Sequence, residues 1–360
     1  MLRYLEIKKQ LQDLIAVTTP GEKLADRVTL CRRFDTTRTT LDKAIRELVR
    51  EGMLTSRKGS GTYVASSLQI AQQNAGSWCV IVPNIIEPIY NTLVSSIEKS
   101  AQQLNINVIL CSSENNFLKQ ERFVRRLAKS GIAGFIIVPV ITSSYSENQR
   151  LYSNLQELEI PFLFCNRSVD GINAPVVTSN NFYGGYIATK HFISRGYRKI
   201  AYISHRQYSS CIDRCQGYMS ALMEAGLPIN RSIIRMPRAD AEPLNYYEEA
   251  KLLIQNTDID AIFCFSDSGA FQVMNAILDS GLSVSDDIGV IGYNNSDSCT
   301  VSFPPLTSVS YETPEIGQKA TEVLYNLCNN RKSSSGFEYY LFQPKLFIRE
   351  SCKGPRNACI

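Results

Sequence analysis

The sequence predicts an α/β protein in which a small N-terminal domain of helices and a β-hairpin precedes a larger, two-lobed body with parallel sheets. The chain has 360 residues, which suffices for two or three domains of roughly 100–200 residues each. Residues 1–66 carry 13 Lys+Arg and 8 Asp+Glu, whereas residues 67–360 carry 25 and 26. The local balances of +5 and −1 indicate that only the first segment meets a polyanion. From residue 78 onward, short apolar runs alternate with amphipathic helical segments, as in parallel α/β sheets.

Three helices are predicted in the first segment. Apolar side chains recur at helical spacing over residues 3–16, and Pro20-Gly21 then ends this helix. Asp26 can cap a second, short helix. The apolar side of that helix comprises Val28, Leu30, Cys31 and Phe34. Thr37 is a suitable N-cap for a third helix, which Gly52 ends. The inward face of the third helix comprises Leu41, Ala44, Ile45, Leu48 and Val49.

The third helix and the hairpin after it have the composition of a DNA-binding surface. Strands over 53–57 and 62–65 flank a basic, glycine-rich tip, and the complete arrangement is a winged helix-turn-helix. In that fold the third helix enters the major groove, where Arg and Thr side chains reach bases and phosphates. The alternative, that the charges only solvate a small helical domain, does not account for all elements occurring in this order. The residues expected at DNA are Lys23, Arg27, Arg38, Thr39, Thr40, Lys43, Arg46, Lys58, Gly59, Ser60 and Gly61.

This segment resembles the GntR family of bacterial regulators. The resemblance rests on the residues from Pro20 to Leu24, on Glu51-Gly52, and on the run from Gly59 to Val64. Two positions depart from the family pattern. Val28 stands where the family usually has an arginine, and Asp42 stands where it commonly has a basic residue. A carboxylate at the second position would repel phosphate or select a cytosine amino group.

Residues 67–77 are polar with little periodicity, which predicts a flexible tether between the two parts of the chain. The body that follows is predicted to hold seven strands and six helices. The strands are expected over 79–83, 107–111, 134–138, 161–165, 199–204, 260–265 and 288–293. The helices are expected near 89–104, 117–130, 181–195, 212–226, 244–256 and 266–281. About 275 residues are too many for one sheet, so two lobes are expected.

Polar side chains directly follow several of these strands. In parallel α/β sheets, ligands bind beyond the carboxyl ends of the strands. Amides and carboxylates can bond vicinal hydroxyls, an aromatic ring can cover the apolar face of a sugar, and arginine can hold a ring oxygen or an anionic group. The alternative for each residue is that a strand-end Asn or Asp only caps its loop. The predicted effector site comprises Asn84, Glu87, Tyr90, Asn166, Arg167, Arg214, Asp267 and Asn294.

The body resembles the LacI/GalR effector domain, a relative of the periplasmic sugar-binding proteins. The motifs that carry the resemblance are Glu87–Tyr90, Asn166-Arg167, Phe265–Asp267, Gly292–Asn295 and Pro305–Val309. The resemblance implies a ligand cleft between two lobes within residues 78–352, a tail of residues 353–360, and chain crossings near 178, 307 and 340. Glu87 replaces a usual Asn of the family, and Asn166 and Asn294 each replace a usual Asp. A GntR-type head on a LacI-type body is similar to the arabinose repressor AraR subgroup.

These observations lead us to expect a ligand-responsive bacterial repressor. It would bind pseudo-palindromic operator DNA as a homodimer and be released by a small-molecule effector, a monosaccharide in the favoured interpretation. The alternative keeps the same DNA reader but replaces the sugar with a nucleoside or a phosphorylated metabolite, which could act as co-repressor or activator. Both readings place the protein in the cytoplasm, because Met1–Val17 carries charges throughout and no apolar run reaches the roughly 18–20 residues that span a bilayer.

Catalysis, a cofactor and a metal site are not expected. The chain has only two histidines, His191 and His205, and neither accompanies a G-x-S-x-G nucleophile motif. It also lacks a phosphate-binding P-loop and a complete dinucleotide-binding fingerprint. Cys211 and Cys215 could share a helix face, but so few imidazole ligands make a zinc site improbable.

Overall fold

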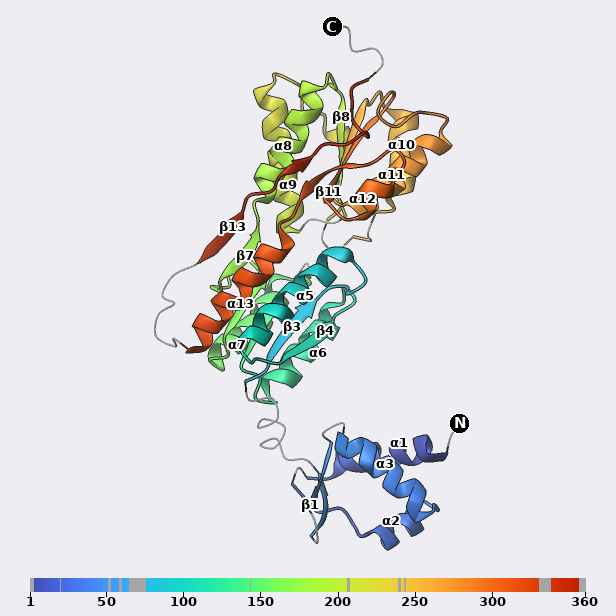
Figure 1. The fold of residues 1–360 in the computed structure, drawn as a ribbon, viewed down its shortest axis with the longest axis vertical. Coiled ribbons are helices and arrows are strands. Elements are labelled where there is room, and N and C mark those ends of the chain that lie inside the picture. Colours follow the sequence, from blue (N-terminus) through green and yellow to red (C-terminus); the bar gives the residue numbers. More distant parts are fainter. Residues whose placement is uncertain are drawn as a thin grey trace. The chain divides into compact units, whose positions relative to one another are not determined.

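The computed structural model describes residues 3–19, 21–50, 53–57, 60–64, 76–142, 144–205, 208–238, 241–242, 244–329 and 338–355 (Figure 1). The chain divides into two compact units. The first consists of residues 1–77 with Val124–Ala133, and the second of Trp78–Phe123 with Gly134–Ile360. We call residues 3–64 the head and the described residues from 78 to 355 the body. The predicted tip residues Lys58 and Gly59, the predicted helix end at Gly52 and most of the predicted tether lie outside the described residues.

The head is the predicted winged helix-turn-helix. Its elements are α1 (Arg3–Val17), α2 (Arg27–Arg33), α3 (Arg38–Arg50), β1 (Leu54–Arg57) and β2 (Gly61–Val64). The two strands form an antiparallel hairpin in which Leu54 lies opposite Val64. Asp26 caps α2 as predicted, because its Oδ1 accepts a hydrogen bond from the Thr29 backbone N at 2.8 Å. Leu11, Leu30, Leu41 and Leu48 are fully buried in one core that joins all three helices.

One predicted core residue of the head is wrong. Val28 was expected on the apolar side of the second helix, but it is 61% exposed. Leu30 of the same helix is fully buried. Two residues along a helix correspond to about 200°, so Val28 and Leu30 face opposite sides.

The body contains two six-stranded sheets, each at the centre of one lobe. In lobe 1 the strand order is β13-β7-β6-β5-β3-β4, and all neighbours are parallel. The strands are β3 (Trp78–Val82), β4 (Val108–Ser112), β5 (Gly134–Ile137), β6 (Phe162–Cys165), β7 (Val176–Ser179) and β13 (Tyr339–Phe342). Between these strands in the chain lie α5 (Pro88–Gln103), α6 (Phe117–Ala128) and α7 (Tyr145–Glu157). A later helix, α13 (Thr313–Asn329), packs beside α5 and contacts β6 and β7 (Figure 1).

Lobe 2 has the strand order β14-β12-β11-β10-β8-β9. All neighbours are parallel except β14, which pairs antiparallel with β12. The strands are β8 (Ile200–Ile203), β9 (Ile234–Arg235), β10 (Ala261–Cys264), β11 (Gly289–Asn294), β12 (Thr307–Ser310) and β14 (Leu346–Phe347). The helices are α8 (Asn181–Ser194), α9 (Ser209–Glu224), the 3-10 turn η1 (Arg231–Ile233), α10 (Tyr246–Asn256), α11 (Asp267–Asp279) and α12 (Ser298–Val301).

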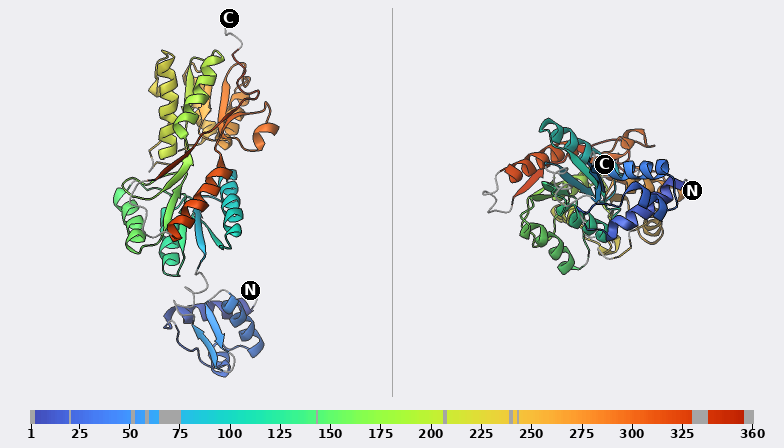
Figure 2. Two further views of the ribbon diagram at one scale, coloured as in Figure 1. Left: turned by 60° about the vertical axis from the view of Figure 1, so that its left-hand side comes forward. Right: turned by 90° about the horizontal axis from the view of Figure 1, so that it is seen from below.

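The chain passes between the two sheets three times (Figure 2). It leaves lobe 1 after β7, returns after β12 to form α13 and β13, and enters lobe 2 again at β14. Three connections at one side allow two lobes to change their angle without unfolding either sheet. No helix within the described part of the chain is long and apolar enough to cross a membrane.

All seven predicted strands and six predicted helices of the body are present, but the sequence did not predict α7, α13 or the short strands β7, β9, β12, β13 and β14.

Candidate functional sites

The outward face of α3 carries most of the predicted DNA-contacting side chains that the structure describes; Arg27 begins α2, and Lys23 precedes that helix. Lys23, Arg38, Thr39, Lys43 and Arg46 are exposed, and Arg27 and Thr40 are half-buried. The Thr37 hydroxyl lies 2.9 Å from that of Thr40 and accepts from the Thr40 backbone N at 3.4 Å, so the start of the helix is capped as predicted. This face therefore presents a row of cationic and hydroxyl groups on a rigid helix.

A carboxylate lies in the middle of this basic face. The Nε atom of Arg27 lies 2.7 Å from Oδ1 of Asp42, and the Nε atom of Arg38 lies 3.8 Å from Oδ2 of the same carboxylate. The Arg38 side chain is 79% exposed, so it can leave this pair at little cost. Asp42 thus occupies, in the free protein, a position where a DNA phosphate could pair with both arginines.

The wing presents the predicted residues Ser60 and Gly61. The Ser60 hydroxyl lies 2.6 Å from the Tyr63 hydroxyl, and Gly61 has a φ of +127°, which L-residues rarely adopt. A Cβ on Gly61 would lie 2.6 Å from Cε of Lys23, so the glycine also lets Lys23 lie across the strand. Lys43 is held above the Tyr4 ring, with its Nζ 3.9 Å from the ring centroid.

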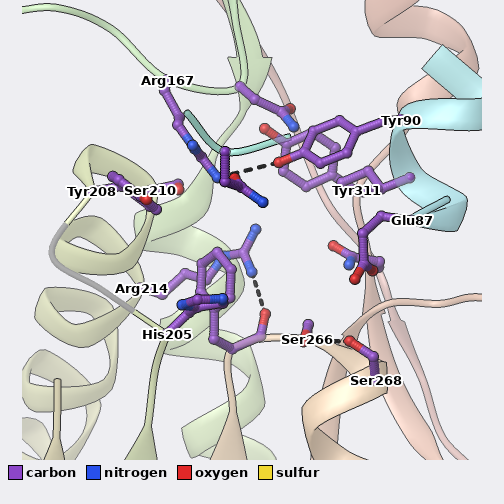
Figure 3. A pocket seen from close by; sticks show the side chains of 15 residues that line it. Glu87, Tyr90, Arg167, His205, Tyr208, Ser210, Arg214, Ser266, Ser268 and Tyr311 are labelled. Carbon is purple, nitrogen blue, oxygen red and sulfur yellow. Dashed lines mark hydrogen bonds between the residues drawn. The ribbon is translucent and has the colours of Figure 1, made fainter. Parts of the chain in front are cut away.

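A pocket lies between the lobes of the body, beyond the carboxyl ends of strands from both sheets (Figure 3). Six of the eight predicted effector residues line it: Glu87, Tyr90, Asn166, Arg167, Arg214 and Asn294. Glu87 and Tyr90 lie at the start of α5, and Asn166-Arg167 directly follow β6. Arg214 lies on α9 and Asn294 ends β11.

Arg167 enters the pocket from lobe 1 and is held by neutral groups. It is only 7% exposed. Its Nη1 donates to the Pro139 carbonyl and its Nη2 to the Tyr90 hydroxyl, both at 3.2 Å. The Tyr208 ring covers the guanidinium, with Cζ 3.8 Å from the ring centroid. These contacts fix the cation in one orientation.

Arg214 enters from lobe 2 and is only 2% exposed. Its Nε donates to Asn181 Oδ1 at 2.9 Å, and its Nη1 donates to the Phe265 carbonyl (Figure 3). The guanidinium Cζ lies 3.4 Å from the Tyr293 ring centroid and 4.2 Å from that of Phe265. A close approach of α8 and α9 sets this position, because a Cβ on Gly185 would lie 2.1 Å from the Arg214 carbonyl oxygen.

Neither pocket arginine pairs with a carboxylate among the residues that the structure describes. Their hydrogen-bond acceptors are carbonyls, an amide and a phenol. Burial raises the pKa of Tyr90, although the charge of Arg167 acts in the opposite direction. Tyr90 therefore remains a neutral phenol that accepts from Arg167 and keeps its own proton available for a ligand.

Two asparagines at the pocket have left-handed backbones. Asn166 has a φ of +66° and Asn294 a φ of +105°, and Asn tolerates this region better than most L-residues. The Asn294 Oδ1 is buried without a hydrogen-bond partner among the described residues. An unsatisfied buried acceptor at a pocket is a position for a ligand donor.

Two predicted effector residues, Asn84 and Asp267, do not line this pocket. The Oδ1 of Asn84 accepts from the Ile86 backbone N at 3.1 Å, so Asn84 caps its own loop. Asp267 borders a neighbouring hollow, and its carboxylate accepts from the Ser296 backbone N at 2.7 Å and from the Ser308 hydroxyl at 2.5 Å. Burial raises the pKa of Asp267, and these hydrogen bonds oppose that change. The carboxylate oxygens of Asp267 therefore connect the segment after β11 with β12 and do not face the pocket.

Several pocket residues were not among the predicted effector residues: His205, Tyr208, Ser210, Ser266, Ser268 and Tyr311. Ser266 immediately precedes Asp267 and caps α11, with its hydroxyl accepting from the Gly269 backbone N at 3.2 Å. Within the motif Phe265–Asp267, it is Phe265 and Ser266 that line this pocket, whereas Asp267 does not. Tyr208 directly precedes α9, the helix that carries Arg214. Its place in the sequence close to Arg214 is the signal that could have identified Tyr208.

Comparison with known proteins identifies both parts of the chain. Residues 3–64 match the model of bacterial regulatory proteins of the gntR family, and residues 189–352 match the periplasmic binding protein-like domain. An arabinose metabolism transcriptional repressor from Geobacillus stearothermophilus is 24% identical over 356 residues, which cover 98% of each chain. An HTH-type transcriptional repressor PurR from Histophilus somni is 31% identical over 299 residues, which cover 82% of this chain and 86% of the relative.

The solved structures support the same fold. A LacI family transcriptional regulator from Enterococcus faecium with bound ribose superposes with a TM-score of 0.62 and 24% sequence identity. The match covers 77% of this chain and 98% of that regulator. At this level of identity the likeness concerns the fold of the body.

Proposed function

This chain belongs to the bacterial HTH-type transcriptional repressors, and we propose that its GntR-type head binds operator DNA as a homodimer and is released when a sugar effector enters the pocket of the body. The protein is a ligand-responsive transcriptional regulator; its relatives are repressors and not enzymes. The observation that carries the proposal is one chain with both an exposed basic helix face and an enclosed polar pocket.

The geometry of the head supports operator binding through α3. Arg38 and Thr39 lie in the first turn of the helix, which is the part that reaches base edges when such a helix enters the major groove. Lys23 and Ser60 would contact phosphates at the wing. Two heads would read two half-sites, so we expect a pseudo-palindromic operator. Since operator DNA lies in the cytoplasm, the protein acts there.

The three connections between the lobes support effector control. A ligand that contacts Arg167 and Arg214 at the same time favours one angle between the lobes, because these residues belong to different sheets. Release follows only if the effector binds the DNA-free state more tightly, with a coupling of about 1–3 kcal/mol.

Two exposed apolar side chains support a dimer. Val301, the last residue of α12, is 83% exposed, and Phe303, two residues further on, is 91% exposed. Sedimentation of the full-length protein should give a dimer, and Phe303→Ser should shift it toward monomer. A wild-type monomer at micromolar concentration would contradict this part of the proposal.

The test begins with DNA that the full-length protein itself selects from a random-sequence library. Fluorescence anisotropy then measures operator affinity across a panel of monosaccharides and nucleosides. We expect a palindromic selected sequence and at least one sugar that weakens binding tenfold or more, in keeping with the coupling given above. If a nucleoside alone weakens or strengthens binding, the effector class is wrong, and if no ligand alters affinity, the regulatory proposal fails.

A further inference from the structure

We propose that the effector carries a single anionic group, a carboxylate on a polyhydroxylated body, which binds between Arg167 and Arg214. This inference rests on the proposed function and specifies the chemistry of its ligand.

The burial of the two cations is the first step. Arg167 and Arg214 are 7% and 2% exposed, so both guanidiniums are largely removed from water. Arginine does not release its proton in proteins, and a buried charge without a counter-ion carries a large desolvation penalty. No described carboxylate pairs with either one, although ordinary ion pairs occur elsewhere in the body, as between Arg235 and Glu249 at 3.1 Å. A bound anion would supply the missing counter-charge.

The orientation of the two guanidiniums is the second step. Pro139 and Tyr90 anchor one of them, Phe265 and Asn181 anchor the other, and both side chains extend into the pocket from opposite lobes (Figure 3). Tyr208 and Phe265 stack on them, so neither cation needs to be ordered when a ligand arrives. Fixed, paired donors of this kind suit a planar oxyanion such as a carboxylate.

The charge balance of the pocket is the third step. Glu87 is the one acidic residue among the described residues that line it. Apart from His205, the two guanidiniums and one carboxylate of the lining leave a formal charge of +1. A monoanion would neutralise this charge, whereas a neutral sugar would leave it and a phosphate dianion would reverse it.

Hydrogen-bond acceptors and hydroxyl groups complete the recognition of a polyhydroxylated body. Asn294 presents a buried, unpartnered Oδ1, and Glu87 is a second acceptor from the other lobe. Both can accept from hydroxyl groups, while Ser266 and Ser268 can donate to them. The site thus combines cations for one oxyanion with acceptors for several hydroxyls, which is the chemistry of an aldonate or a uronate.

Calorimetric titration of the full-length protein tests the inference. The probes are D-galacturonate, D-glucuronate and D-gluconate, the matched neutral sugars D-galactose and D-glucose, and D-glucose 6-phosphate. We expect at least one carboxylate to bind about 30-fold or more tightly than its neutral counterpart, which corresponds to about 2 kcal/mol for a charge-assisted pair. Arg167→Met should weaken that acid about 100-fold, whereas neutral-sugar binding should change little.

Matched variants exclude loss of fold as the cause. Arg167→Lys keeps the charge and should retain part of the acid preference, and Arg231→Met removes an exposed arginine that does not line the pocket and should leave every affinity unchanged. Three results would each overturn the inference. They are equal or tighter binding of neutral sugars, tighter binding of the phosphate than of every carboxylate, and no binding of any carboxylate. A neutral sugar that releases the operator would overturn it and leave the proposed function standing. An acid that binds without altering operator affinity would leave this inference standing and overturn the proposed function.

Discussion

The head and the pocket each contain two arginines, but the two pairs lie in opposite environments. In the head, Arg27 and Arg38 flank one carboxylate, Asp42, at the surface. In the pocket, Arg167 and Arg214 are buried and contact carbonyls, an amide and aromatic rings instead. Arg27 and Arg38 of the head therefore share one carboxylate, whereas Arg167 and Arg214 of the pocket form no ion pair with a described carboxylate.

This difference fits the two kinds of partner. A surface ion pair is worth about 0–1 kcal/mol, so a DNA phosphate can replace Asp42 at small cost. The buried arginines keep their full charge in a region of low dielectric, where one small ligand can gain several strong hydrogen bonds. Exposed and paired cations suit an extended polyanion, and buried cations with no carboxylate partner suit a single small anion.

The largest effect is expected in the pocket. Arg214→Met removes a buried donor group and should reduce acid affinity by about 3 kcal/mol or more, roughly 100-fold, while the head retains its intrinsic affinity for DNA. Calorimetry and operator anisotropy measure the two quantities on the same preparation, and circular dichroism shows whether the variant is folded. A folded variant with unchanged acid affinity would remove Arg214 from the site.

The next effect concerns the head. Arg38→Ala removes an exposed donor from the first turn of α3 and should weaken operator binding by about 1–3 kcal/mol. Effector affinity should remain within experimental error, because the pocket is unchanged. Arg195→Ala, which removes an exposed arginine of the body, serves as the control in both assays. A similar loss in the control would mean that only net charge matters.

A smaller effect is expected when the internal counter-ion is removed. Asp42→Asn frees Arg27 and Arg38 for phosphates and should tighten binding to random-sequence DNA by about 0.5–1 kcal/mol, with a steeper dependence on salt. Selection of a new operator by this variant shows whether Asp42 also reads a base. Weaker binding to random DNA would indicate that Asp42 positions the arginines instead of competing with phosphate.

The smallest expected effect is on the pH dependence of stability. It comes from His191, a buried side chain that can exist without a charge. Burial lowers the pKa of His191 below 6.5, and Arg195 acts in the same direction. The unfolded chain then binds the proton more tightly than the folded protein, so stability is lost as the pH falls below 6.5 until the folded pKa is passed. His191→Gln should make the melting temperature less dependent on pH between 7 and 5. An unchanged dependence would assign the acid sensitivity to other groups.

The sequence predicted the head more completely than the body. Asp26 and Thr37 mark helix starts through local hydrogen bonds, and the leucines of α3 repeat at helical spacing, so local information suffices there. In the body, α7 was missed because its sequence is mostly polar and only one side of it is buried. The strand β7 was missed because only its first two residues, Val176 and Val177, are apolar, so it lacks the longer apolar run of the predicted strands.

The sequence predicted the pocket residues that a local pattern marks. It did not predict those whose position in the pocket depends on tertiary packing. Arg167 stood out because it follows an apolar run that predicts a strand, and Arg214 because it lies at the start of a predicted helix. Asn84 and Asp267 have equally suitable side chains, but their acceptors are used by backbone groups and a hydroxyl nearby. For Asn84 this contact is local, two residues along the chain, whereas for Asp267 only the positions of Ser296 and Ser308 in space reveal it.

The central claim is that the two arginine pairs serve different partners that communicate. It is tested most directly by operator anisotropy with and without the tightest-binding sugar acid, for wild type, Arg167→Met and Arg38→Ala. We predict that the acid releases wild type from DNA and no longer releases Arg167→Met at the same concentration. Arg38→Ala should bind DNA weakly but still bind the acid with wild-type affinity. Release of Arg167→Met at the wild-type acid concentration, or loss of acid binding in Arg38→Ala, would contradict the account.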